Sequence, residues 1–219
     1  MLFANPSHKR TARSTCTMGA MTDARPLRAD AARNRAALLA AAADEFAERG
    51  MDASVADIAR RAGVGKGTVF RHFPTKDDLI AAIVLDRVGE LTDAGQRLLG
   101  AEDPGAALLE FMTVAAHQRQ QRDLSFLPGA GDVDPAVARA RERMYRTVHD
   151  LVGRARDHGA LRADVTGTDI ILLMCAPNYV AGYAPGASPD LWRRYLGILF
   201  DGLRPQGAHP LPEPPPPAL

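Results

Sequence analysis

Basic and hydroxyl side chains gather between residues 54 and 76 of this 219-residue chain, and their types and spacing suit contact with DNA. Lys66, Thr68 and Arg71 fall within one predicted short helix. Lysine and arginine donate to O6 and N7 of guanine, and a threonine methyl packs on a thymine methyl. We therefore predict that these three side chains contact base edges, while Gly67 lets the helix approach the bases closely.

Three further side chains of this stretch suit the phosphate backbone, namely Ser54, His72 and Lys76. Phosphate contacts set the register of a protein on DNA and carry no direct sequence information. Lys76 also stands at a predicted helix start, where free backbone N–H groups favour an anion. Two interpretations of Phe70 stay open, because this side chain suits either the sugar–phosphate edge or the core.

A predicted helix-turn-helix carries these side chains. Ser54 precedes the first helix, and Asp57 follows it by three residues, which is the spacing of a capping box. Gly63 stands in the turn, where a left-handed residue is favoured. The second helix covers about 65–72 and ends before Pro74. A short basic helix braced by a preceding helix is a device for reading the major groove of DNA.

Positive charge is concentrated in the same region. The formal net charge of the chain is +1, but residues 25–76 carry ten Lys/Arg and six Asp/Glu, a local charge of +4 that leaves −3 elsewhere. This asymmetry favours a basic head on a neutral-to-acidic body. Cys16 and Cys175 are the only cysteines, so we predict a cytoplasmic protein without a structural disulfide. The longest apolar run, 170–176, is too short to span a membrane.

Apolar periodicity predicts an all-α fold of about nine helices, with a three-helix head followed by a helical bundle. The predicted domains are a disordered arm (1–27), a helix-turn-helix domain (28–74), a helical body (75–203) and a Pro-rich disordered tail (204–219). The predicted helices cover 29–49, 54–61, 65–72, 75–99, 105–122, 134–158, 168–182 and a last segment from Ser188-Pro189 to about 203. The helix over 75–99 is expected to be a strut from head to body. The arm is interpreted either as a phosphate-contacting extension or as an over-extended reading frame, because Met21 offers a natural start.

The body contains aromatic, sulfur-containing and polar residues that suit a ligand site between helices. The candidates are Phe111, His117, Phe126, Met144, Met174, Cys175, Asn178 and Tyr179. A stripe of Met and Phe at helical spacing also fits a plain core, and both interpretations stay open. Asn178 is the most specific candidate because it follows Pro177 in an apolar helix, where proline frees an upstream carbonyl.

Residues 33–79 resemble the DNA-binding head of the TetR/AcrR family of bacterial repressors. The resemblance is carried by Phe46, Gly50, Ile58-Ala59, Ala62-Gly63-Val64, Gly67-Thr68, His72-Phe73-Pro74, Lys76 and Leu79. Phe70 departs from the tyrosine that is usual in the family, so it lacks a hydroxyl for a phosphate. Gly65 stands where serine is frequent, and it caps the predicted DNA-reading helix without a side chain.

The resemblance implies a homodimer that binds a palindromic operator in double-stranded DNA. It also implies release by an unidentified small ligand, apolar or amphipathic, held in the body (75–203). The last two helices are expected to form the dimer interface through Ala181, Leu196, Leu199 and Leu203. A two-fold dimer then places two recognition helices about 34–36 Å apart, which is one turn of DNA.

Two other classes of protein compete with this interpretation. An enzyme is disfavoured because the chain lacks H-E-x-x-H, P-loop and G-x-S-x-G motifs. Two distant cysteines likewise form no cluster with the spacing of metal ligands, so we expect no catalytic residue, cofactor or metal site. The second class is an effector-independent architectural or cell-division DNA-binding protein. A solid core in the body would favour that class, and a cavity would argue against it.

Overall fold

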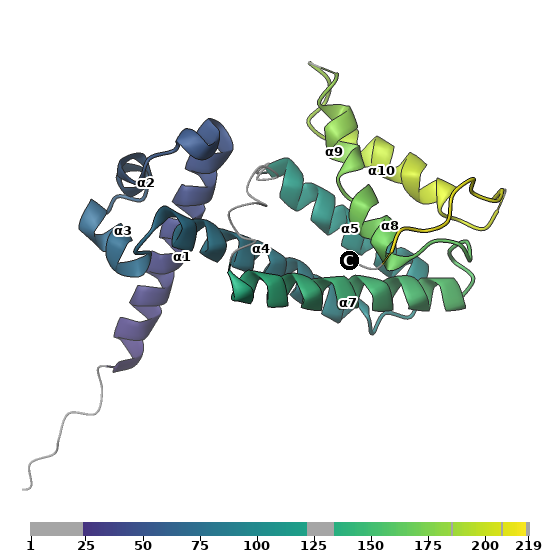
Figure 1. The fold of residues 1–219 in the computed structure, drawn as a ribbon, viewed down its shortest axis with the longest axis horizontal. Helices are drawn as coiled ribbons and strands as arrows, with labels where there is room; N and C mark the ends of the chain where they lie inside the picture. Colours follow the sequence, from purple (N-terminus) through teal and green to yellow (C-terminus); the bar gives the residue numbers. More distant parts are fainter. Residues whose placement is uncertain (1–23, 122–133, 185, 207, 218–219) are drawn as a thin grey trace, which may run out of the picture.

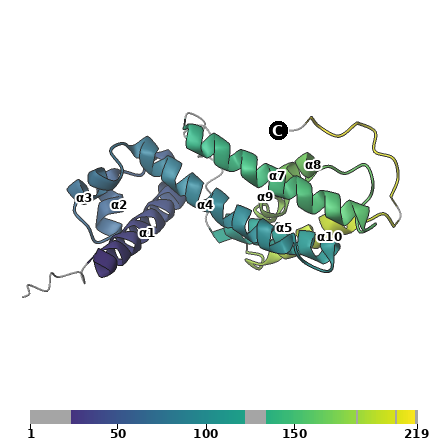
Figure 2. The same cartoon turned by 90° about the horizontal axis from the view of Figure 1, so that it is seen from below.

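The computed structural model describes residues 24–121, 134–184, 186–206 and 208–217, with side chains of the first helix from residue 32 onward. All regular elements within these ranges are helical, which confirms the predicted all-α class. A head lies at one end of an elongated body, and one long helix, α4, joins the two parts (Figure 1, Figure 2). Each part has its own buried apolar cluster.

The head is a three-helix unit closed by the start of α4. Its elements are α1 (Ala24–Arg49), a 3₁₀ turn (Gly50–Asp52), α2 (Val55–Arg61) and α3 (Lys66–His72). Its core is apolar and buried, with Leu38, Phe46, Ile58, Val69, Phe73, Leu79 and Ile80 among its members. The predicted helix-turn-helix is therefore confirmed, with the core side chains drawn from every helix of the head.

Two glycines turn the chain between the helices of the head. Gly50 has φ 59° and Gly63 has φ 67°, which is the left-handed conformation expected at these stops. A residue with a Cβ pays about 1–2 kcal/mol for that conformation. The predicted capping box of α2 is only half formed. Ser54 Oγ accepts from the Asp57 N–H at 3.1 Å, but the Asp57 carboxylate bonds the Ser54 hydroxyl and two arginines instead of the Ser54 N–H.

Helix α4 (Lys76–Leu98) belongs to both cores. It begins with a complete capping box, in which Thr75 Oγ1 accepts from the Asp78 N–H at 3.0 Å and the Asp78 carboxylate accepts from the Thr75 N–H at 2.9 Å. Its first half packs into the head through Leu79, Ile80 and Ile83. Its second half packs against the body through Val88, Leu91 and Leu98. The predicted strut is confirmed.

The body surrounds a second core. Its other helices are α5 (Pro104–Gln121), α7 (Pro135–Asp157), α8 (Gly167–Leu173), α9 (Ala176–Ala181) and α10 (Leu191–Gly202). The core includes Phe111, Met112, Val148, Leu151, Trp192, Leu196 and Phe200. Figure 1 shows α7 running beside α4, with α9 and α10 on the opposite side of the body. Helix α7 contributes Val148 and Leu151 to this core.

The predicted single helix over 168–182 is wrong. The chain forms α8 up to Leu173 and starts α9 at Ala176. Pro177 has no N–H to donate to the Leu173 carbonyl, and its ring clashes with that carbonyl in a continuous helix. The break therefore falls just upstream of the proline, at Met174 and Cys175.

Two helix starts also differ from the prediction. Helix α1 begins at Ala24, so residues 24–27 of the predicted arm are helical. Helix α10 begins at Leu191, after a turn in which Ser188 Oγ accepts from the Asp190 N–H at 3.2 Å. The rest of the predicted arm lies outside the described residues.

The described part of the Pro-rich tail forms no helix or strand and contacts the connection between α7 and α8. The Arg162 N–H donates to the Leu203 carbonyl at 3.0 Å, and its guanidinium bonds the His209 carbonyl. The same guanidinium lies 2.6 Å from Asp164 and, through that hydrogen bond, lowers the pKa of this carboxyl. Arg162 thus anchors the start of the tail to the body.

A glycine permits the close approach of α4 to α7. A Cβ placed on Gly95 would lie 2.6 Å from the Thr147 methyl and 3.2 Å from the Phe111 ring. Gly89 lies on the same helix, and a Cβ there would meet nothing within 4 Å. Substituting alanine at each of the two glycines therefore distinguishes the effect of packing from the effect of helix propensity.

We expect Gly95→Ala to destabilise the fold by about 1–3 kcal/mol, because the added methyl overpacks the contact with a rigid neighbouring helix. Gly89→Ala is the matched control and should stabilise the fold by about 0.5–1 kcal/mol through helix propensity. Urea unfolding followed by circular dichroism measures both changes. An equal gain in the two variants would contradict the close approach.

Candidate DNA-binding surface and effector cleft

Helix α3 buries one face and exposes the other. Val69 and the C-cap residue Phe73 lie in the head core. Its exposed residues include Lys66, Gly67, Phe70 and Arg71, whose spacing of three and four residues places them on one side of the helix. Phe70 is 48% exposed, so the core interpretation of this side chain is wrong. The predicted base-reading residues of α3 thus share its solvent-facing side, with Thr68 at the edge.

Arg71 lies along its own helix in this structure. Its Nε donates to the Gly67 carbonyl at 3.1 Å, and its Nη2 donates to Thr68 Oγ1 at 2.9 Å. An arginine has five N–H donors, so two bonds within the helix leave others for guanine acceptors. The bond also directs the Thr68 hydroxyl toward the guanidinium. Gly65, the N-cap of α3, makes no side-chain bond.

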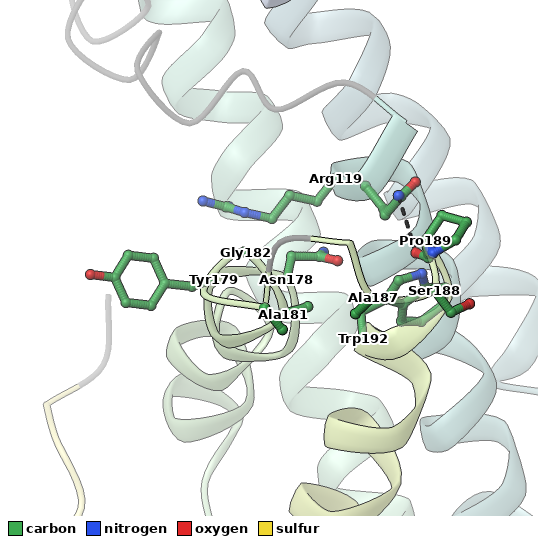
Figure 3. A pocket seen from close by; sticks show the side chains of 11 residues that line it. Arg119, Asn178, Tyr179, Ala181, Gly182, Ala187, Ser188, Pro189 and Trp192 are labelled. Carbon is green, nitrogen blue, oxygen red and sulfur yellow. Dashed lines mark hydrogen bonds between the residues drawn. The ribbon is translucent and has the colours of Figure 1, made fainter.

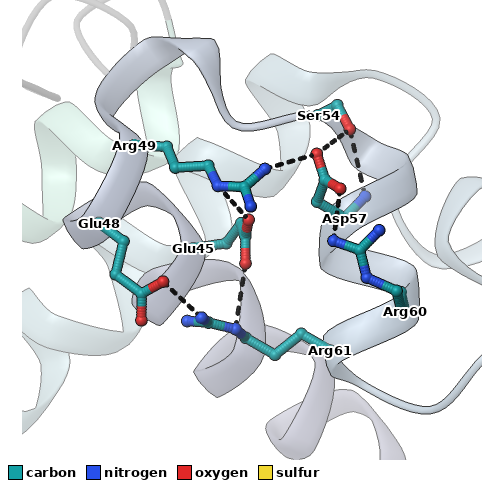
Figure 4. Close-up of polar contacts among 7 residues, drawn as sticks. All are labelled: Glu45, Glu48, Arg49, Ser54, Asp57, Arg60 and Arg61. Carbon is teal, nitrogen blue, oxygen red and sulfur yellow. Dashed lines mark hydrogen bonds and ion pairs between the residues drawn. The ribbon is translucent and has the colours of Figure 1, made fainter.

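A buried carboxylate fixes α2 against α1 (Figure 4). The Glu45 side chain is 3% exposed, and its two oxygens lie 3.0 Å from Nε of Arg49 and 3.0 Å from Nε of Arg61. Arg49 also lies 3.1 Å from Asp57, and Arg61 lies 2.5 Å from Glu48. Each arginine therefore bridges α1 and α2. Pairing of this kind is what makes a buried charge tolerable.

Asp57 joins this network to the turn before α2 (Figure 4). Its Oδ2 accepts from the Ser54 hydroxyl at 2.6 Å, and its Oδ1 accepts from Arg60 at 2.6 Å. The Ser54 bond is the main cause that lowers the pKa of Asp57, and the nearby arginines add to it. Ser54 and Arg60 thus already have partners in the absence of DNA, and phosphate contact by Ser54 remains a prediction.

The two remaining predicted phosphate ligands lie where α3 meets α4. His72 is exposed and is the last residue of α3. Lys76 Nζ bonds the Met51 carbonyl and lies 5.4 Å from the centre of the Phe46 ring. Its ammonium group therefore ties α4 to the turn after α1. Contact of His72 and Lys76 with phosphate remains a prediction.

A cleft of about 550 Å³ opens in the body between the end of α5, α9 and the connection to α10 (Figure 3). It is lined by Arg119, Gln120, Asn178, Tyr179, Ala181, Gly182, Ala184, Ala187, Ser188, Pro189 and Trp192. Its volume falls within the range of ligand sites, about 300–1,000 Å³. Asn178 donates to the Ala116 carbonyl at 2.8 Å, and Gln120 donates to the Pro189 carbonyl at 3.2 Å.

The structure divides the predicted pocket residues among several places. Asn178 and Tyr179 line this cleft, whereas Met174 and Cys175 line a second hollow of about 210 Å³ between α4, α5 and α8. The pocket prediction is wrong for Phe111 and Met144, which pack in the body core because their helical spacing turns them inward. His117 is exposed, with its ring 6.3 Å from that of Trp192. Phe126 lies outside the described residues.

Sequence reasoning missed most of the cleft. Its walls are the small residues of 181–189 and the end of α5, and its largest lining side chain is Trp192. The usable signal was the run of small residues between two apolar helices. Large apolar side chains drew the prediction to the core instead.

Two family profiles match the chain. Residues 38–83 match the bacterial regulatory proteins of the tetR family, and residues 103–205 match the SbtR-like transcriptional regulator C-terminal domain. The crystal structure of the TetR transcription regulatory protein from Mycobacterium vanbaalenii is 38% identical, with a TM-score of 0.61 over 82% of this chain and 99% of that one. The chain belongs to the TetR family.

Curated relatives of this TetR-family chain include transcriptional repressors. The HTH-type transcriptional repressor Rv3405c from Mycobacterium tuberculosis is 56% identical over 71 residues, which cover 32% of this chain and 35% of that protein. The chain thus matches about a third of the length of this relative and of two other mycobacterial regulators. The HTH-type transcriptional repressor KstR2 from Mycolicibacterium smegmatis is 26% identical over 194 residues, which cover 78% of this chain and 91% of that protein.

The segment from α8 to α10 of this TetR-family chain exposes large apolar side chains. They are Leu172, Tyr179, Val180, Tyr183 and Ile198. The Tyr179 and Tyr183 hydroxyls lie 2.8 Å apart, and their rings meet edge to face. We call these five residues the outer apolar surface.

The predicted interface residues lie elsewhere. Leu196 and Leu203 are buried in the core of the protomer itself, so their placement at a dimer interface is wrong. Ala181 and Leu199 pack partly against the same core. Leu196 and Leu203 do lie on one side of α10, but that side faces the core of the chain's own body. The outer apolar surface consists of residues outside that stripe.

No helix in the described ranges is long and apolar enough to cross a membrane. Within the same ranges, no group of three His, Cys, Asp or Glu side chains is placed to hold a metal ion.

We expect Glu45→Gln to lower the free energy of unfolding by about 1.5–3 kcal/mol, because it removes the buried negative charge that pairs with Arg49 and Arg61. Glu48→Gln is the matched control, since Glu48 also contacts Arg61 but is exposed. Its effect should be clearly smaller, because an exposed ion pair contributes little to stability. Denaturant unfolding measures both, and equal losses would show that the buried carboxylate does not hold the head together.

The lowered pKa of Asp57 predicts that the free energy of unfolding decreases at acid pH, and we call this decrease the acid limb. Because the folded pKa lies below the ordinary value of about 3.9, this carboxylate stabilises the fold above that value. The contribution is lost as the pH falls through the folded pKa. Ser54→Ala should raise the Asp57 pKa toward the ordinary value and move the acid limb to higher pH. A carbon NMR titration of the Asp57 carboxyl measures the shift, and an unchanged midpoint would contradict the role of the hydroxyl.

Proposed function

We propose that this TetR-family chain is a dimeric transcriptional repressor that binds a palindromic operator and is released by a small molecule. The observation that carries the proposal is the solvent-facing side of α3, where Lys66, Gly67 and Arg71 stand over a buried side formed by Val69 and Phe73. A helix held in this way can enter the major groove without disturbing the core behind it.

The head supports this role because it is rigid behind α3. Glu45 and its two arginines lock α1 to α2, and Lys76 ties the start of α4 to the turn after α1. Rigid elements position base contacts more accurately than mobile ones. Lys66, Thr68 and Arg71 would contact bases, and Ser54, Gly65, Phe70, His72 and Lys76 would face the sugar–phosphate backbone.

The outer apolar surface supports the dimer. Exposed apolar patches of this kind mark interaction sites. Tyr179 and Ile198 belong to α9 and α10, on the side of the body opposite α7, and Tyr183 lies in the turn after α9. A second copy bound there by a two-fold axis would present two α3 helices on one side of the assembly. Their spacing would be about 34–36 Å if both enter successive major grooves.

The cleft supports a ligand-released repressor over an effector-independent DNA-binding protein. The last two turns of α5 contact both the cleft and the strut. Asn178 bonds Ala116, and Gln118 bonds Glu90 of α4 at 2.6 Å. A ligand that shifts α5 would therefore move α4 and the head. The relatives are regulators and not enzymes, so we propose binding and no catalysis.

We expect Arg71→Ala to weaken binding to DNA from upstream of its own gene by about 1–3 kcal/mol, if the side chain reads a guanine. Arg97→Ala is the matched control, because Arg97 is exposed at the opposite end of α4. It removes the same charge and should leave affinity unchanged. Fluorescence anisotropy with a labelled duplex measures both, and equal losses would exclude a specific role for Arg71.

We expect Ile198→Glu to convert the protein to a monomer, because it places a charge in the outer apolar surface. Leu211→Glu is the control, since Leu211 is also exposed and apolar but lies in the tail. Sedimentation velocity reports the oligomeric state. A dimer that survives Ile198→Glu would place the interface on another surface.

A further inference from the structure

Among the described residues, no acidic side chain lines the cleft between α5, α9 and α10. The lining they supply combines small residues such as Ala181, Ala184 and Ala187 with a few polar groups, and Arg119 is the one charged residue in it. Figure 3 shows the Asn178 amide directed from α9 toward the side of Ala187 and Trp192, whereas Tyr179 points away. Asn178 and Trp192 therefore determine what hydrogen bonds the inner wall can make.

The orientation of the Asn178 amide is determined by its partner. Its Nδ2 donates to the Ala116 carbonyl at 2.8 Å, and a carbonyl can only accept. The other end of the amide, Oδ1, is buried and has no hydrogen-bond partner among the described residues. It is an acceptor without a donor.

Trp192 has a hydrogen-bond donor without an acceptor. Its side chain belongs to a residue that is 1% exposed, and its Nε1–H has no acceptor in the described part of the chain. Arg193 lies over the indole at 4.5 Å, and the His117 ring lies 6.3 Å away, so neither satisfies the N–H. The indole nitrogen can only donate. One wall of the cleft thus holds a buried donor and a buried acceptor, both unpaired.

Unpaired buried polar atoms are rare and destabilise the state that contains them. Both atoms are closed off from solvent in this conformation, so a ligand can reach them only when the wall around 181–192 shifts. A ligand that supplies an acceptor and a donor would then bind the shifted state better than the present one. Such a difference in affinity between two states is what a ligand needs to move an equilibrium.

We infer that the cleft takes an uncharged ligand whose polar group both accepts and donates a hydrogen bond, such as a carboxamide or lactam, on a compact apolar body. The acceptor of the ligand pairs with Trp192 Nε1–H, and its donor pairs with Asn178 Oδ1. A carboxylate can accept the hydrogen bond from Trp192 Nε1–H, but it has no donor for Asn178 Oδ1 and places a negative charge beside that unpaired oxygen. This inference rests on the proposed effector role of the cleft and adds the chemical class of the effector.

Three probes of one chain length test the inference: octanamide, N,N-dimethyloctanamide, which lacks the donor, and octanoate, which is charged. Trp192 is the only tryptophan of the chain, so its emission reports occupancy directly. We expect octanamide to shift the emission at concentrations about tenfold or more below those needed for the other two. Comparable or tighter binding of octanoate or the dimethyl amide, or no response to octanamide, would overturn the inference.

Variants assign the preference to the two atoms. Asn178→Leu should bind octanamide and its dimethyl analogue equally, whereas Thr113→Val, a change on α5 outside the lining, should keep the preference. If Asn178→Leu does not fold, Trp192→Phe removes the N–H and keeps an aromatic ring, and the thermal midpoint then reports binding. Persistence of the octanamide preference in a folded Asn178→Leu, or unchanged affinity for both amides in Trp192→Phe, would contradict the assignment.

Operator binding by the same samples separates this inference from the proposed function. If the protein binds DNA but does not respond to octanamide, the amide-type ligand is contradicted and the proposed regulator function stands. If the protein shows the expected probe preference but does not bind DNA, the ligand site is supported and the proposed repressor function is contradicted.

Discussion

Two hydrophobic cores share a single helix, and this constraint governs the whole molecule. The first half of α4 packs among the head residues, and its second half packs beside α5 and α7. Any change in the direction of α4 therefore reorients the head. The absence of a side chain at Gly95 allows α7 to lie close against the body half of this helix. A capping box at Thr75 begins the helix firmly within the head.

The head can follow α4 as one piece because charge and apolar packing work together within it. Phe46, Ile58 and Val69 fill the centre, while Glu45 draws an arginine from each of α1 and α2 to one buried carboxylate. The exposed side of α3 stands on this frame. In the body, the end of α5 contacts the cleft through Ala116 and contacts α4 through Gln118. A few direct contacts therefore connect the cleft, through α5 and α4, to the head that carries α3.

Much of this arrangement could be predicted from local rules in the sequence. Gly63 marked the turn of the helix-turn-helix, the spacing of Ser54 and Asp57 marked a helix start, and apolar periodicity predicted the all-α fold. Global choices could not be predicted in the same way. Periodicity showed that Leu196 and Leu203 share a side of α10 but not whether that side faces its own body or a partner.

The cleft escaped prediction for a related reason. Small residues supply much of its lining, and no pattern of large side chains in the sequence identifies such a space. The pairing of Glu45 with Arg61 joins positions far apart in the sequence, so charge spacing along the chain could not reveal it. Features that depend on tertiary approach were therefore missed, whereas features set within one helix or turn were found.

Hydroxyl-radical footprinting of the duplex upstream of the gene tests the central claim most directly, namely that paired α3 helices enter DNA. The account predicts two protected patches on one side of the duplex, about 34–36 Å apart, that fade as salt is raised. Uniform or absent protection, or protection that ignores salt, would contradict it.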